Sequence, residues 1–244
     1  MKRISFIIFC ILICSLSQAQ NNIITRFKSC KYDANNNYKV ITSSISFSRE
    51  NNGIGRIYLF PSYSDESVKS FYFWTTDSRK PGIAEMKSML INIKEKYVKW
   101  TQIAKDNHIT NYSKKLEGKD IYIPNFQGTL EYKNRQWWAS EWSLHIVPYF
   151  IVDENGNCLI KLNCPPSTFQ TVKNFDNALQ GMIYMGAGEG FDSLKSCDAY
   201  YLFSSPEQIQ SMIEALDFDK ACKEVDAQKK QENDRKSKLD ELFN

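Results

Sequence analysis

The sequence predicts an α/β domain, with a β-hairpin before it and a helical extension after it. Residues 38–60 alternate between apolar and polar side chains around a polar turn, as paired strands do. Residues 82–106 repeat apolar side chains every three or four positions, which is typical of a helix with one buried face. Residues 145–162 form two apolar runs joined by an acidic, glycine-containing turn, which indicates a second hairpin.

Residues 1–19 are expected to be a signal peptide. The segment has a basic start, an apolar run and small residues around Ala19, where cleavage is expected. The apolar run is shorter than the roughly 20 residues that cross a membrane. Cys14 would suit a lipoprotein, but lipoprotein signals carry a small residue before the cysteine and this chain has Ile13. The mature chain is therefore expected to be periplasmic or secreted, with no integral membrane span.

The charge balance of the chain gives no sign of a polyanionic partner. There are 31 Lys and Arg residues against 28 Asp and Glu residues, and two of the basic residues belong to the expected signal peptide. This near balance argues against nucleic acid as a partner. Apolar residues at 42% and aromatic residues at 14% favour a packed globule over a disordered chain.

The first expected element after the signal is a flexible leader over 20–37, which is polar and rich in Asn. The hairpin over 38–60 follows, and then a strand over 67–76 that becomes apolar on both faces, as a central strand would be. Pro81 and Gly82 stand at the start of the long helix, where the missing proline donor costs nothing.

The second half begins with residues 107–140, where a short strand over 120–124 is expected, and TLEYKNRQWWASEW (129–142) could form a helix or a hairpin arm. Residues 167–185 have helical spacing and residues 199–203 indicate a late strand, which closes a domain over 38–204. Ser205-Pro206 resembles a helix cap, so a C-terminal helix with a charged tail is expected over 205–244. The tail is charged on all sides, which favours a solvated helix end over a partner-binding helix.

Two stretches, WSLHIVPYFIVDENG (142–156) and FWTTDSRKPGIAEM (73–86), resemble the thioredoxin-like fold. The likeness is to the branch of periplasmic thiol-disulfide oxidoreductases, the TlpA-like proteins, in which a proline-led hairpin faces a helix start. The resemblance implies a thioredoxin-like three-layer α/β domain. It also implies a cis Val147–Pro148 bond, the alternative being a trans proline at the start of an edge strand.

The dithiol of that family is missing. Where the family has Cys-x-Pro-Cys, this chain has Arg79-Lys80-Pro81-Gly82. Dithiol exchange needs a thiolate at a helix N-terminus and a second thiol that resolves the mixed disulfide. This departure from the family therefore predicts a redox-inactive protein, without catalytic residues at the usual site, and no cofactor is expected. The two histidines give no zinc-ligand spacing, so no metal site is expected either.

The predicted function is that of an exported binding or scaffolding module. Two cations beside the free donors of a helix start would suit a carboxylate or phosphate group. In the family, the proline loop also pairs its main chain with an extended substrate. The expected partner is therefore an extended or acidic peptide segment of another exported protein. The alternative is that Arg79 and Lys80 are merely solvated charges beside an unused site. The predicted binding residues are Arg79, Lys80, Val147, Pro148 and Trp74.

Two alternatives stay open. One is an enzyme similar to thiol-disulfide oxidoreductases that has moved its chemistry to a single exposed, low-pKa cysteine such as Cys164 or Cys197. Five cysteines follow the signal, so at least one is unpaired; Cys158 and Cys164 would lie about 20 Å apart on a straight strand, beyond disulfide reach. The other alternative is an all-β exported binding protein, if the helix over 82–106 does not cross over onto the sheet.

Overall fold

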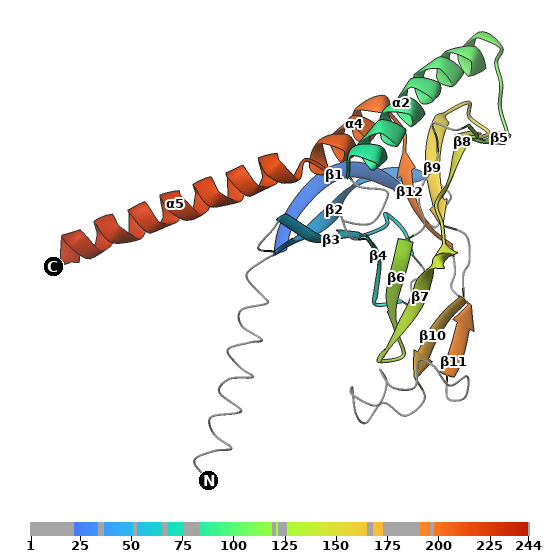
Figure 1. The fold of residues 1–244 in the computed structure, drawn as a ribbon. Coiled ribbons are helices and arrows are strands. Elements are labelled where there is room, and N and C mark those ends of the chain that lie inside the picture. The colour runs from blue at the N-terminus through green and yellow to red at the C-terminus, as the bar shows by residue number, and fades with distance from the viewer. Residues whose placement is uncertain are drawn as a thin grey trace.

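The computed structural model describes most of the chain after the expected signal peptide. The described residues are 22–33, 37–50, 53–64, 68–75, 83–118, 121, 126–164, 168–172, 191–195 and 198–243. Within these ranges, twelve strands form a single sheet and the registered neighbours are antiparallel (Figure 1).

The strands are β1 (Asn22–Tyr32), β2 (Tyr38–Glu50), β3 (Gly53–Leu59), β4 (Ser70–Thr75), β5 (Tyr112–Lys115), β6 (Phe126–Tyr132), β7 (Arg135–Leu144), β8 (Val147–Val152), β9 (Cys158–Cys164), β10 (Thr168–Val172), β11 (Phe191–Lys195) and β12 (Ala199–Phe203). The helices are α2 (Ile83–Asp106), α4 (Pro206–Ala215) and α5 (Phe218–Phe243). The strand order across the sheet is β11-β10-β7-β6-β4-β3-β2-β1-β12-β9-β8-β5.

The prediction of a thioredoxin-like three-layer α/β domain is wrong. That fold would place the strand before the long helix close to the proline-led strand, but five strands separate β4 from β8. Helix α2 does not connect two parallel neighbours either, because it leads from β4 to β5 at the far edge of the sheet. The chain is a mostly-β protein built on one antiparallel sheet.

Residues 22–32 form β1 instead of the expected flexible leader. β1 pairs with β2 along its whole length, from Asn22 opposite Ser48 to Tyr32 opposite Tyr38. Ile23 and Phe27 point into the core, with 5% and 3% of their surfaces exposed. The strand is therefore anchored on both sides, by β2 and by the core.

Of the other expected elements, some are confirmed, one is wrong in part, and some residues lie outside the described ranges. The hairpin over 38–60, the helix over 82–106, the hairpin over 145–162 and the strand over 199–203 are confirmed. The helix over 167–185 is wrong at its start, where β10 forms, and its remainder lies outside the described residues, as do most of residues 120–124.

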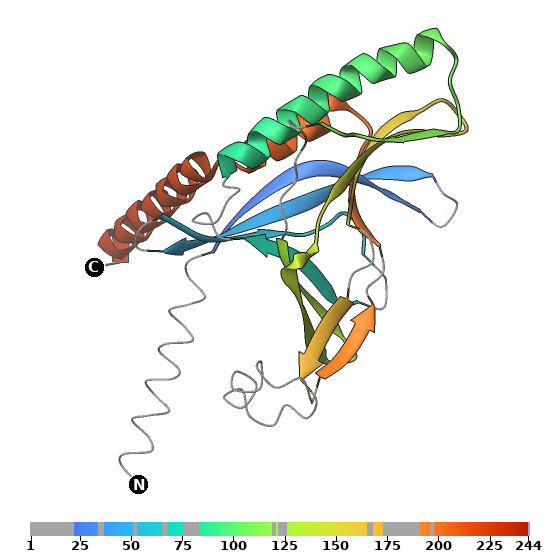
Figure 2. The same ribbon diagram turned by 45° about the vertical axis from the view of Figure 1, so that its right-hand side comes forward.

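The larger of two buried apolar clusters joins strands from both halves of the sheet, whose curvature Figures 1 and 2 show. Strands from both halves of the sheet contribute fully buried side chains, among them Phe47 of β2, Phe73 of β4 and Ile160 of β9. Helix α2 adds Leu90 and Ile93 to the same cluster. Because these side chains belong to one cluster, the sheet and helices form one packed unit.

Helix α4 fills the place where β1 and β12 diverge. Among the described residues these two strands share one registered pair, Cys30 with Leu202. Beyond it, the backbone N–H of Lys28 donates to Ser211 Oγ of α4 at 3.2 Å. Helix α2 lies beside α4 (Figure 2), and Lys94 Nζ donates to Gln210 Oε1 at 2.7 Å. Helix α4 thus supplies a hydrogen-bond partner for the β1 edge beyond Cys30, and α2 is bonded to α4.

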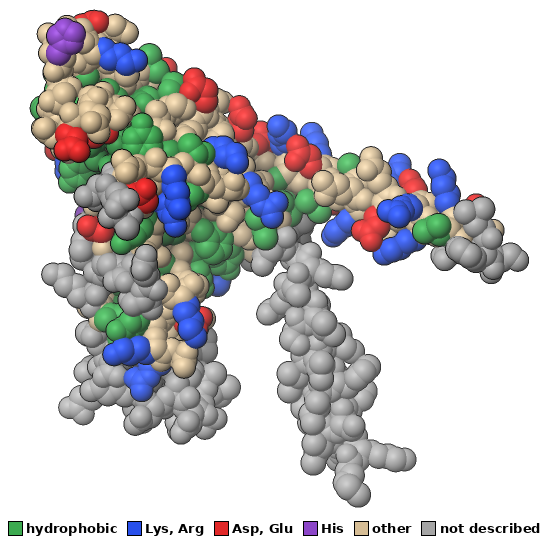
Figure 3. All heavy atoms as spheres, turned by 180° about the vertical axis from the view of Figure 1, so that it is seen from behind, with side chains coloured by type: hydrophobic (Ala, Val, Ile, Leu, Met, Phe, Trp, Pro, Cys, Tyr) green, Lys and Arg blue, Asp and Glu red, His purple; other side chains and the backbone are tan. Residues whose placement is uncertain are grey.

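Helix α5 extends away from the sheet (Figure 1). Phe218 at its start packs against Phe47, with ring centroids 5.5 Å apart. Residues 226–239 are exposed, and Figure 3 shows both basic and acidic side chains along the helix. In the part of the chain that the structure describes, no helix combines the length and apolar character needed to cross a membrane.

Candidate functional site

The described residues of the predicted binding corner are not brought together. Trp74 lies in β4, where its backbone partners are Tyr58 and Gln127. Val147 and Pro148 lie in β8, on the other side of the five intervening strands. Arg79 and Lys80 lie outside the described residues. The structure therefore separates Trp74 from the proline that was expected to face it.

Pro148 lies inside a strand without breaking the ladder to β9. Its carbonyl accepts a hydrogen bond from the Leu116 N–H at 2.9 Å, so this carbonyl points toward the β5 side of the strand. In an antiparallel strand, the nitrogen of a residue points to the same side as its carbonyl. The missing donor therefore faces the end of β5, whose pairing stops at Lys115. The fold does not support the thioredoxin-like resemblance from which a cis Val147–Pro148 bond was inferred. The cis isomer stays a prediction.

The cysteines in the described ranges are poorly placed for thiol exchange. Cys164 is 2% exposed at the end of β9, and Cys30 and Cys158 are also buried. Burial raises the pKa of the Cys158 thiol, which disfavours the reactive thiolate. Cys222 is half-buried on α5, and Cys197 lies outside the described residues. A relocated thiol at Cys164 is therefore not supported.

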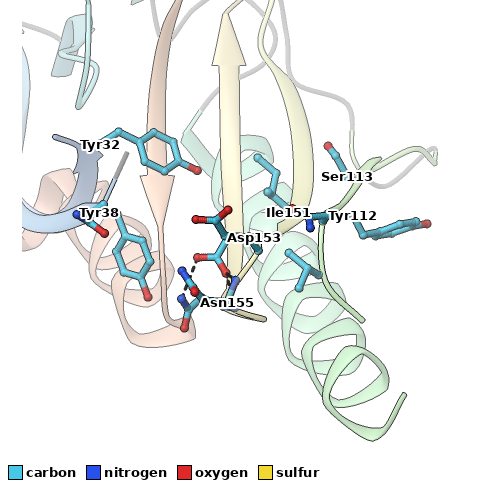
Figure 4. A pocket seen from close by; sticks show the side chains of 12 residues that line it. Tyr32, Tyr38, Tyr112, Ser113, Ile151, Asp153 and Asn155 are labelled. Carbon is cyan, nitrogen blue, oxygen red and sulfur yellow. Dashed lines mark hydrogen bonds between the residues drawn. The ribbon is translucent and has the colours of Figure 1, made fainter. Parts of the chain in front are cut away.

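A pocket of about 800 Å³ opens where three segments remote in sequence converge. The β1–β2 hairpin contributes Tyr32, Asn37 and Tyr38, while residues 111–113 approach at the start of β5 and residues within 151–157 form the β8–β9 turn. Figure 4 shows Tyr32 and Tyr38 reaching from the hairpin toward Asp153 and Asn155. The volume lies in the range of small-molecule binding sites.

The two turns that border this pocket follow the same design. Asp33 N–H donates to the Asn37 carbonyl at 2.7 Å and Asn37 N–H donates to Asp33 Oδ1 at 3.0 Å. In the same way, Asp153 N–H donates to the Asn157 carbonyl at 3.0 Å and Asn157 N–H donates to Asp153 Oδ1 at 2.8 Å. Both sequences read D-x-N-x-N, as DANNN and DENGN. We call them the twin turns.

The turn at Asp153 contains further hydrogen bonds to the Asp153 carboxylate. Asp153 Oδ1 also accepts from the Asn155 N–H at 2.9 Å, and Asp153 Oδ2 accepts from Asn157 Nδ2 at 2.8 Å. Gly156 has φ of +79°, a backbone conformation that glycine adopts without steric cost. Asn111 N–H donates to the Asp153 carbonyl at 3.1 Å and so ties the start of β5 to this turn. The carboxylate of Asp153 thus organises the turn.

The tyrosine side of the pocket packs against a small aromatic cluster on the sheet. Tyr32 packs edge-on against Tyr200 with ring centroids 6.2 Å apart, and Tyr200 stacks on Tyr63 at 4.9 Å. Lys161 Nζ lies 4.6 Å from the centre of the Tyr200 ring. Burial, and after it the negative charge of Asp153, raises the pKa of both Tyr32 and Tyr38. These phenols therefore stay neutral at physiological pH and can both donate and accept hydrogen bonds.

A smaller apolar pocket of about 200 Å³ lies on the other side of β5. It is bounded by Trp100 and Ile103 of α2 and by Phe150 of β8. Tyr112 and Val152 line both pockets. Lys114 Nζ lies 5.1 Å from the centre of the Trp100 ring and so covers part of this pocket. The larger pocket is the better candidate site. Several polar side chains line it, whereas the smaller pocket is lined mostly by apolar side chains.

Comparisons with protein-family models, with curated proteins and with solved structures found no match to this chain. The site must therefore be interpreted from its own chemistry. Sequence reasoning recognised the turn at Asp153 but missed Tyr32, Tyr38 and Asn37. The signal that was present is the repeated D-x-N-x-N motif, at 33–37 and 153–157.

Proposed function

We propose that this chain is an exported binding module that acts without catalysis, and that the pocket between the twin turns holds its ligand. The observation that carries the proposal is the convergence of three remote segments on one space of about 800 Å³. Such a pocket with a few polar groups aimed into it is the usual form of a ligand site. Export rests on the expected signal peptide, which lies outside the described residues.

The chemistry of the pocket supports binding over catalysis. Among the described lining residues there is no histidine, cysteine, lysine or arginine. Of its two carboxylates, Asp153 already accepts three hydrogen bonds within its turn, and Glu154 is exposed. General acid–base catalysis requires a titrating group held against the reacting atom, and nucleophilic catalysis requires an activated nucleophile. The described lining offers neither arrangement.

The test is a thermal-shift screen of the chain without residues 1–19 against mixed libraries of oligosaccharides, peptides and metabolites. The Tyr38→Ala variant is screened in parallel, with Tyr58→Ala as a control that removes a half-buried strand tyrosine outside the pocket. A ligand at about 100 times its Kd stabilises the folded state by about 2.7 kcal/mol, which raises Tm by several degrees.

The proposal expects a ligand that raises the Tm of the wild type and of Tyr58→Ala but not of Tyr38→Ala. Mass spectrometry should recover that ligand unchanged. A ligand recovered as a chemically altered product would contradict the non-catalytic role. If every stabilising ligand acts equally on Tyr38→Ala, the pocket is not the binding site.

The redox part of the proposal has its own measurement. In an insulin-reduction assay the chain should not exceed the background rate of the reductant alone, because the described cysteines are buried or half-buried. Catalysed reduction would show that a thiol of this chain is active and would reinstate the enzyme interpretation.

A further inference from the structure

Building on the proposed binding role, we infer that the pocket between the twin turns takes a neutral, hydroxyl-rich ligand, namely an oligosaccharide. The pocket combines half-buried tyrosine rings with a high density of amide side chains. A sugar presents hydroxyl groups around its rim and C–H groups on its ring faces. The two kinds of surface on the protein match these two kinds of surface on a sugar.

The charges around the pocket exclude an anionic ligand. The described lining contains two carboxylates and no basic side chain. An acidic peptide, phosphate or uronic acid would therefore meet like charge without a compensating cation. The acidic peptide that the sequence suggested does not fit this pocket.

A cationic ligand is also poorly matched. Cations are held by aromatic faces together with carboxylates that are shielded from water. Here Asp153 directs both of its carboxylate oxygens to donors within its own turn. Glu154 is exposed, so water screens its charge. Neither carboxylate is positioned as the counter-ion of a buried cation.

The amide groups suit hydroxyl groups. Four asparagines line the pocket: Asn37 and Asn157 close the twin turns, Asn155 lies inside the second turn, and Asn111 is bonded to that turn from the start of β5. All four are exposed. An asparagine side chain offers both donors and acceptors, and a sugar hydroxyl needs both. Ser113 adds a hydroxyl group of the same dual character.

The tyrosine rings are held in place before a ligand arrives. Tyr32 and Tyr38 are directly opposite each other in the β1–β2 ladder, so their side chains lie on the same face. Tyr32 is supported from behind by Tyr200, which is only 6% exposed. Fixed aromatic groups lose little freedom on binding, which favours their use as contact surfaces.

The experiment is isothermal titration of the chain without residues 1–19, preceded by a neutral-glycan array that selects the sugar. The titrants are that neutral oligosaccharide, an oligogalacturonate of equal length and an oligo-lysine peptide. The pocket variants are Tyr38→Ala and Asn155→Ala. Their matched controls are Tyr58→Ala and Asn233→Ala, of which the latter removes an exposed asparagine from α5.

The expected result is binding of a neutral glycan that weakens about tenfold in Tyr38→Ala and about threefold or more in Asn155→Ala, as the loss of one aromatic contact or one hydrogen bond implies. Both controls should bind like the wild type, and oligogalacturonate should not bind. Tyr38-dependent binding of oligo-lysine, with no neutral glycan bound, would overturn the ligand class and leave the binding role intact. If no probe depends on Tyr38 or Asn155, the ligand class and the proposed site both fail.

Discussion

Two buried tyrosines of this protein have hydroxyl groups in opposite surroundings. The Tyr97 hydroxyl, on α2, lies 2.9 Å from the Cys158 carbonyl and 2.8 Å from the Ser204 carbonyl. The Tyr201 hydroxyl, on β12, has no hydrogen-bond partner among the described residues, although only 1% of this residue is exposed. Burial raises the pKa of both groups, so both stay protonated.

We expect Tyr97→Phe to lower the free energy of unfolding by about 1–2 kcal/mol, because it removes the one hydroxyl proton that the Cys158 and Ser204 carbonyls share. Tyr201→Phe removes a hydroxyl without a described partner, so it should leave stability unchanged or raise it by up to about 1 kcal/mol. Urea unfolding of the two variants measures both effects. Equal losses in both would show that Tyr201 has a partner after all.

Tyr200 should make the stability of the folded chain depend on pH in the alkaline range. Burial, as the largest cause, raises the pKa of Tyr200 to about 12, from the ordinary value of 10.0. The folded chain therefore holds this proton more tightly than the unfolded chain does. The stability that Tyr200 contributes is complete below pH 10 and is lost as the pH rises from 10 through 12.

The variant Tyr200→Phe keeps the ring and lacks the proton, so its free energy of unfolding should fall less steeply than that of the wild type between pH 9.5 and 11.5. Urea unfolding at intervals of half a pH unit gives both slopes. Parallel curves would mean that Tyr200 titrates alike in the folded and unfolded chains.

At the scale of elements, the packing of β6 against β7 requires a glycine at position 128. A Cβ at Gly128 would overlap Leu144 Cδ1 and would lie 3.4 Å from the Phe169 ring. Gly128→Ala should therefore lower the free energy of unfolding by about 1–3 kcal/mol, as overpacking of a core does. The neighbouring Gln127→Ala serves as the control in thermal and urea unfolding. A Gly128→Ala variant as stable as the wild type would show that Leu144 has another rotamer within easy reach.

Helix α5 divides into an anchored start and a solvated remainder. Truncation after Gln228 removes side chains that are exposed at 229–239 and 241, the positions whose burial is described, and should change the free energy of unfolding by less than about 0.5 kcal/mol. Truncation after Asp217 also removes Phe218 and Ala221, which contact the core, and should cost about 2 kcal/mol. Urea unfolding compares the two truncations. A large loss on truncation after Gln228 would reveal a contact of the distal helix.

The elements themselves were largely predictable from local pattern. The amphipathic helix α2, the hairpin at Asp153 and the cap at Ser205 all depend on residues close in sequence. β1 was missed because Thr25 and Ser29 share a strand face with Ile23 and Phe27, and this polar content looked like a leader. The core around β1 accepts these hydroxyls because they are bonded: Ser29 Oγ lies 2.6 Å from Ser43 Oγ, and Thr25 Oγ1 donates to the Ala215 carbonyl at 2.7 Å.

At the scale of the whole molecule, strand partners could not be predicted from local pattern. A proline-led hairpin after a long helix fits a thioredoxin-like sheet and also fits this antiparallel one, because the same apolar runs serve both. Which of the two sheets forms depends on β1. This strand lies between β2 and β12, so that β4 and β8 are not neighbours. The candidate site depends on the same order, because Tyr32 and Tyr38 reach the Asp153–Asn157 turn only across β12.

This strand order is therefore the central claim, and nuclear Overhauser contacts in the isotopically labelled chain test it most directly. The structure predicts backbone contacts between Cys30 and Leu202 and between Asn111 and Asp153. It also predicts contacts from the rings of Tyr32 and Tyr38 to the Asp153–Asn157 turn. Backbone contacts between β4 and β8 as neighbouring strands would contradict the sheet, and the pocket with it.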